Sequence, residues 1–135
     1  MKRITALSAL AFVLVAGSFN ADAKGIPAAV EKCGVEMADL AIEQINEAGK
    51  QVTAQQRTNA IDYFTAHGCS DMYRTGMKAG VARAPLTKEQ IEEEGLKSMM
   101  ATSDGDSIGT IKRSRRIAHI NAQVWDAGYV EGLKY

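Results

Sequence analysis

Cysteine is scarce in this chain of 135 residues, and the pattern of its two cysteines excludes most cysteine chemistry. Cys33 and Cys69 do not form a C-x-x-C motif, which argues against thiol redox work, and no C-x-x-C-H run is present for covalent haem. A zinc site would need His67 and His119 as partners, because these are the only histidines. Outside the cytosol one even pair of cysteines is most simply a structural disulfide, so we predict a Cys33–Cys69 bond.

The chain also lacks an excess of charge and is poor in aromatic residues. Lys+Arg and Asp+Glu both number 16, so the formal net charge of +0 gives no support for a nucleic acid or an acidic lipid surface as partner. Aromatic residues make up only 6%, so the core must depend on Ile, Leu, Val, Met and Ala. A chain of this length forms one domain with one modest core.

Residues 1–23 have the features of a cleaved signal peptide. Lys2 and Arg3 are followed by an uncharged apolar stretch, and small residues stand at the third-last and last positions, the latter being Ala23. The apolar stretch is shorter than the roughly 20 residues of a membrane-spanning helix. We therefore expect export to the periplasm, a single mature domain at 24–135, and no stable membrane insertion after cleavage.

Apolar residues recur at three- and four-residue spacing in the rest of the chain, which predicts α-helices. Capping boxes at Thr53 and Thr87 each begin one helix. Alternating β-branched runs and Asn-Gly hairpins are absent. We expect an all-α bundle of four to five helices with one disulfide, whose helices occupy about 28–48, 54–68, 70–84, 88–101 and 110–135, with a loop at 102–109.

The stretch Ala66–Asp71 is expected to be the corner of this bundle. Gly68 should end one helix and Ser70 should cap the next. Cys69 lies between them, so its bond to Cys33 would bring three helices together.

Glycine pairs four residues apart occur in two predicted helices, Gly76 with Gly80 and Gly128 with Gly132. Glycine inside a helix costs about 1 kcal/mol relative to alanine, so the pairs need a reason. Either these two helices cross at short range, which we favour, or the pairs form a surface for a partner's backbone. The runs around Gly76 and Gly132 are similar at an offset of 56 residues, but the break at Cys69 has no counterpart in the second run.

The basic run Lys112–Arg116 is the densest cluster of charge. Such a run is usually a solvated helix face, and its acidic counterpart is either internal, at Glu92–Glu94, or a partner protein. If a partner protein is bound by the last helix, we expect it to contact Arg113, Arg115, Arg116, Trp125 and Tyr129.

Catalytic patterns are weak. Neither histidine has a spaced Ser, Cys or Asp partner of the kind that a catalytic triad needs, and no paired-carboxylate motif stands out. Haem held between His119 and a methionine is a remote alternative, and we predict no cofactor and no metal site. The sequence therefore favours a protein that binds another protein over an enzyme.

Two kinds of periplasmic binding protein fit these features. The runs Cys69-x-x-x-Tyr73-x-x-Gly76 and Gly128-Tyr129-x-x-Gly132 resemble motifs of the Tai-type immunity proteins of type VI secretion. The spacing differs and a second disulfide is missing, so no family is assigned. The resemblance implies an inhibitor or immunity protein that blocks an envelope-directed effector; the alternative is a small stress chaperone.

Export predicts the mature N-terminus. Intact-mass analysis of periplasmic material should show a chain that begins at Lys24, because the cleavage site follows Ala23. A chain that keeps Met1 and sediments with membranes would contradict the assignment of the signal peptide.

Overall fold

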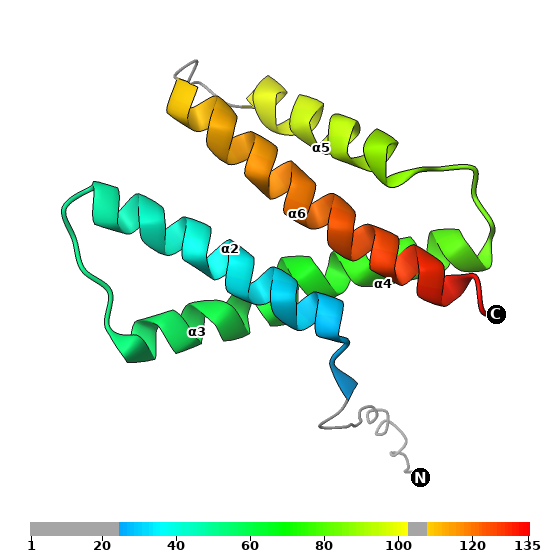
Figure 1. The fold of residues 1–135 in the computed structure, drawn as a ribbon, viewed down its shortest axis with the longest axis horizontal. Coiled ribbons are helices and arrows are strands. Elements are labelled where there is room, and N and C mark those ends of the chain that lie inside the picture. Colours follow the sequence, from blue (N-terminus) through cyan, green and yellow to red (C-terminus); the bar gives the residue numbers. More distant parts are fainter. Residues whose placement is uncertain (1–24, 103–107) are drawn as a thin grey trace, which may run out of the picture.

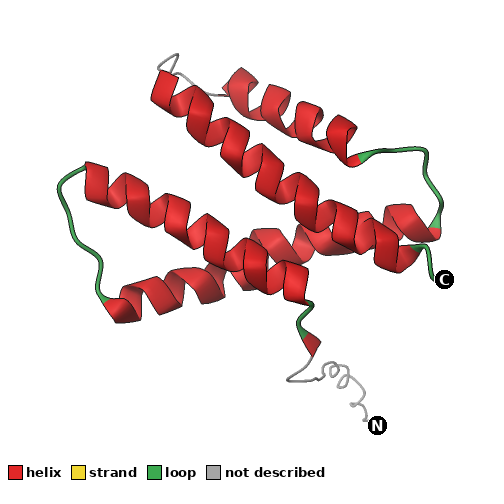
Figure 2. Ribbon diagram, viewed as in Figure 1, coloured by secondary structure: helices red, strands yellow, loops and turns green. Residues whose placement is uncertain are grey.

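The computed structural model describes residues 25–102 and 108–135, and helices make up most of them (Figure 2). The elements are α2 (Ala28–Glu47), α3 (Ala54–Phe64), a π-helical segment (Thr65–Cys69), α4 (Ser70–Val81), α5 (Lys88–Thr102) and α6 (Ile108–Gly132). The predicted all-α bundle with one disulfide is confirmed. The predicted signal peptide and the centre of the loop predicted at 102–109 lie outside the described residues, and α5 and α6 extend into the ends of that loop.

Helix α6 is the centre of the arrangement (Figure 1). It contacts α2, α4 and α5, and in Figure 1 it runs between α2 and α5. Helices α3 and α4 form one kinked rod, on which α2 packs against the first half and α6 against the second. The fold is therefore two helical layers, with the core where α2 and α6 both meet the kink.

Both predicted capping boxes are present. The Gln56 backbone N–H donates to Thr53 Oγ1 at 3.0 Å, and the Thr53 N–H donates to Gln56 Oε1 at 2.9 Å. The second box has the same two bonds between Thr87 and Gln90, at 2.9 and 3.2 Å. Each box satisfies two backbone donors that a helix start leaves free, so α3 and α5 begin where the sequence predicts.

The corner at Ala66–Asp71 agrees with its prediction in one respect and differs in another. The predicted break at Gly68 is present, because His67 and Gly68 have non-helical dihedrals and the rod kinks there. Ser70 does not cap α4, because its hydroxyl donates to the carbonyl of Thr65 at 2.6 Å. The serine thus satisfies an acceptor of the helix before it rather than a donor of the helix after it.

The predicted disulfide is present and buried. Cys33 of α2 is bonded to Cys69 at the junction with α4, and the two Cα atoms are 5.9 Å apart. Both half-cystines are at most 2% exposed and pack in the core with Val30, Leu40 and Val124. The bond therefore ties α2 to the kinked rod at the centre of the core.

Helices α4 and α6 run parallel and touch backbone to backbone. A Cβ atom on Gly76 would lie closer than 3.0 Å to the carbonyl oxygen of Trp125, and one on Gly128 would lie as close to that of Tyr73. The hydrogen in place of each Cβ points at that oxygen, which is the geometry of a weak Cα–H···O contact. The glycines are thus packed inside the protein, as we favoured, and are not a docking surface.

The contact between α4 and α6 has local twofold symmetry. The residues that this symmetry relates are 52 positions apart, not the 56 positions at which the two runs are similar in sequence. Gly80 faces the carbonyl of Tyr129, just as Gly132 faces that of Met77. Gly76 is therefore equivalent to Gly128 and Gly80 to Gly132, an offset of 52 residues instead of 56. The sequence similarity that aligns Tyr73 with Tyr129 therefore does not correspond to the packing of the two helices.

Gly76→Ala tests the crossing. The added methyl group meets main-chain atoms that cannot rotate away, so the free energy of unfolding should fall by at least about 1–3 kcal/mol. Gly95→Ala is the matched control, because its Cβ would lie 3.9 Å from Ala118 Cβ in ordinary contact. That change should raise stability by up to about 1 kcal/mol, since alanine is the better helix former. Equal effects in urea denaturation would contradict this packing.

Candidate functional site

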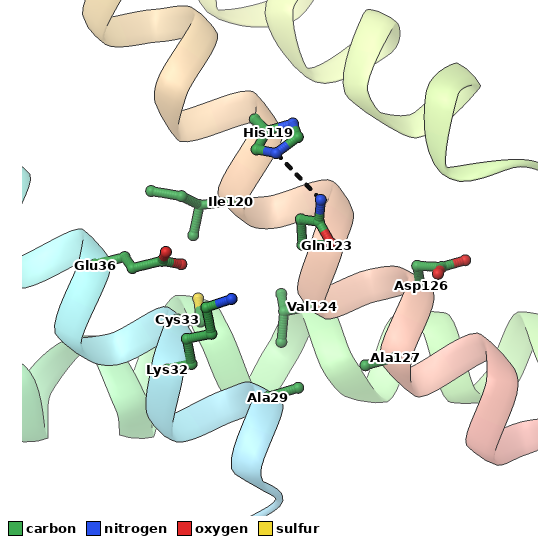
Figure 3. Close-up of a pocket in the computed structure, with 10 residues that line it drawn as sticks. All are labelled: Ala29, Lys32, Cys33, Glu36, His119, Ile120, Gln123, Val124, Asp126 and Ala127. Carbon is green, nitrogen blue, oxygen red and sulfur yellow. Dashed lines mark hydrogen bonds between the residues drawn. The ribbon is translucent and has the colours of Figure 1, made fainter.

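A cavity of about 310 Å³ opens between α2 and α6, beside the disulfide (Figure 3). Its floor is apolar and is made by Ala29, Cys33, Ile120, Val124 and Ala127. We name this cavity with its rim the α2–α6 groove. Ala29 of α2 and Ala127 of α6 lie at one end of the groove, where their small side chains leave room for an inserted group, and Ile120 lies at the other end (Figure 3).

The rim of the groove is charged. It is formed by Lys32 and Glu36 from α2 and by His119 and Gln123 from α6, while the carboxylate of Asp126 points away from α2 (Figure 3). Glu36 and Asp126 are partly buried. Lys32, Glu36 and Asp126 make no ion pair or hydrogen bond with any residue that the structure describes. Charges left without a partner beside an apolar floor are available to a bound molecule.

His119 is held in place at the rim. Its Nδ1 lies 3.1 Å from Glu92 Oε1 of α5, and its Nε2 lies 3.1 Å from Gln123 Nε2. Both ring nitrogens therefore have a neighbour within the protein. This arrangement orients the ring as part of the wall and directs neither nitrogen into the groove as a base or as an axial haem ligand.

Two ion pairs cross from α6 to the C-terminal part of α2, beyond the groove. Arg113 Nη2 donates to Glu47 Oε1 and Arg116 Nη1 donates to Glu43 Oε1, each at 2.9 Å. The basic run thus has an internal acidic partner, but it is α2 and not the Glu92–Glu94 run that we named. Of that run, Glu92 engages His119 instead.

The predicted partner-binding residues do not form one open surface. Trp125 is only 2% exposed, so a protein docking on the folded domain does not reach it, and its proposed place on a binding surface is not supported. Tyr129 stacks on Trp125 with ring centroids 5.1 Å apart and donates a hydrogen bond to the Ala84 carbonyl at 2.6 Å. Of the five residues, only Arg115 is both exposed and without an ion pair to the described residues.

A second cavity, of about 540 Å³, lies between the start of α2 and the helices α4 and α6. Its charged residues are already paired, Arg74 with Asp71 and Glu131 with Lys134. Burial, and then the charge of Glu131, raises the pKa of the Tyr73 phenol above its usual value, so Tyr73 stays neutral. Since its charges are satisfied, we place the candidate site in the α2–α6 groove.

Sequence reasoning missed the residues of the rim. Lys32 and Glu36 flank the core residue Cys33 at helical spacing, and Gln123 and Asp126 flank Val124. In the sequence, these residues are visible only as polar positions next to the apolar positions of two helices. Such a pattern indicates a binding site only when those two helices are known to be neighbours.

Other kinds of site find no support in the described ranges 25–102 and 108–135. No group of three or more His, Cys, Asp or Glu side chains there is placed to hold a metal ion. None of the helices in these ranges combines the length and the apolar character needed to cross a bilayer. Comparisons with protein-family models, with curated protein sequences and with solved structures give no significant match.

The ion pairs can be tested by Arg113→Met. Loss of the pair with Glu47 should lower the free energy of unfolding by up to about 1 kcal/mol, and less in high salt, because one partner is exposed. Arg115→Met is the matched control from the same run and should leave stability unchanged. If both variants melt alike at low salt, the internal pairing of the basic run is wrong.

Proposed function

We propose that this domain is a non-enzymatic periplasmic protein that binds another protein through the α2–α6 groove, as an inhibitor or immunity protein directed at an envelope-active effector. The observation that carries the proposal is the groove itself, whose apolar floor is bordered by Lys32 and Glu36, and neither of these has a partner among the described residues. Protein interfaces have this composition, with an apolar centre that excludes water and a polar rim.

The rigidity of the groove supports an inhibitor in particular. One wall, α2, is bonded to the kinked rod through Cys33, and the other wall, α6, packs on the same rod through the glycine crossing. Walls that are fixed before binding lose little conformational entropy when a partner docks. Tight, stoichiometric inhibition benefits from such preorganisation.

Two observations support the compartment. The buried Cys33–Cys69 disulfide suits an oxidising environment outside the cytosol. The N-terminal residues 1–23 have the composition of an export signal. Together they favour the periplasm as the place where the domain meets its partner.

A binding role is also favoured over catalysis. The histidine at the groove is engaged at both ring nitrogens, by Glu92 and Gln123. A general base must reach the proton that it abstracts, and His119 is directed elsewhere. The same geometry disfavours the haem alternative, because no methionine is among the residues that line the groove beside His119.

A stress chaperone remains the second candidate. Val81, Val130 and Leu133 are 50%, 53% and 39% exposed near the C-terminal ends of α4 and α6. Apolar side chains on the surface suit the capture of unfolded clients. The two functions differ in the stoichiometry of binding. A chaperone binds many clients weakly, whereas an inhibitor binds one partner in a one-to-one complex.

Site-specific photo-crosslinking in the periplasm of producing cells tests the proposal. A photoreactive residue in place of the exposed Gln123, at the rim, should give one stoichiometric adduct with another protein. The same residue in place of Gln55, which is exposed on α3 away from the groove, should give none. A ladder of weak adducts from position 123 would favour the chaperone, and adducts from position 55 alone would contradict binding at the groove.

A further inference from the structure

Lys32 and Glu36 are charges of opposite sign that stay apart on one wall of the groove. They stand four residues apart on α2, about 6 Å along its axis, and Figure 3 shows both side chains extending from α2 toward α6. Neither makes an ion pair or hydrogen bond with any described residue, the other one included. A helical pair with the lysine on the N-terminal side is the weaker of the two possible orders. The helix itself therefore leaves both charges available to a bound molecule.

Other charges near the groove make the order of the charges, and not their sum, the basis of selection. A cavity of about 390 Å³ adjoins the groove, shares Glu36 with it, and is also lined by Arg115 and Arg116. Arg116 is paired with Glu43, whereas Arg115 is exposed and has no ion pair with the described residues. A lone cation near Glu36 would therefore also meet the positive charges of Lys32 and Arg115, and a lone anion near Lys32 would meet Glu36.

We propose that the α2–α6 groove receives a helix of the partner protein that presents an acidic and a basic side chain on successive turns. The acidic side chain pairs with Lys32 and the basic one with Glu36. Two residues four apart on the partner helix repeat the spacing of about 6 Å that separates Lys32 from Glu36. Apolar residues of the same face lie over the floor at Ala29 and Val124.

Helices with other charge patterns fit this groove less well. A helix with two acidic side chains brings one of them to Glu36, and a helix with two basic side chains brings one of them to Lys32. An uncharged helix covers the floor but takes water from both charges without replacing it. The charge of His119 does not alter this choice, because Glu92 of α5 faces its ring at 3.1 Å in either protonation state.

The inference rests on the proposed function and is tested apart from it with alanine-based helical peptides. One peptide has an arginine and, four residues later, a glutamate, an order that pairs weakly within the peptide. Two matched peptides have two glutamates or two arginines at these positions. Each is titrated into the folded mature protein at low salt and followed by amide NMR shifts. The mixed peptide should bind tightest, by up to about fivefold for each ion pair that a like-charged peptide lacks. Its saturable shifts should be confined to residues 29–39 and 115–127.

Charge reversals in the protein should switch the preference among the peptides. Glu36→Lys makes the wall of α2 basic at both positions, so the peptide with two glutamates should become the tightest binder. Lys32→Glu makes the wall acidic at both positions and should favour the peptide with two arginines. Such gains of binding cannot come from damage to the fold. Glu93→Lys, on the exposed side of α5, is the matched control and should leave the order of the three peptides unchanged.

Two results would overturn the inference. One is a mixed peptide that binds no better than the like-charged peptides, or that binds without shifts in the groove. The other is an order of the three peptides that neither reversal changes. Crosslinking of a partner from position 123 alongside either result would leave the proposed function intact and reject only the helix with paired charges.

Discussion

Close contact between the backbones of α4 and α6 is the constraint on which the other helices depend. Four residues without a Cβ atom allow it, and their carbonyl neighbours leave no space for a methyl group. Helices that pack through larger side chains stay about 8–10 Å apart. Because α6 is held on α4 at this shorter range, its other faces are free to pack against α2 and α5. The glycines thus place α6 at the centre of the fold.

The disulfide places the second wall of the groove. Cys33 anchors α2 at the kink between α3 and α4, directly beside the part of α6 that carries Ile120 and Val124. Further along, Arg113 and Arg116 join α6 to the end of α2 through exposed ion pairs, which are individually weak. The groove is built on the strong attachment, because Cys33 is part of its floor, and the weak ion pairs lie beyond it toward the C-terminal end of α2. Its geometry therefore follows from the core and not from the surface.

Charge on the seam between α2 and α6 is divided into two zones. At the far end of α2, each glutamate has an arginine of α6 as partner. At the groove, Glu36 has no partner among the described residues. This difference in pairing cannot be read from the composition, in which acidic and basic residues are equal in number. The paired glutamates therefore join α2 to α6, whereas Glu36 is left for a bound molecule.

Local patterns in the sequence were sufficient for the helices, the capping boxes at Thr53 and Thr87, and the pairing of the only two cysteines. The helices and capping boxes depend on residues close together in the chain, and two cysteines can form only one intramolecular disulfide. Only the tertiary structure decided that Trp125 is buried, that Ser70 bonds backward, and which side chains line the groove. These depend on which helices become neighbours. Backbone packing at the glycines and the position of the disulfide determine which helices become neighbours, and the sequence pattern of a single helix does not show this.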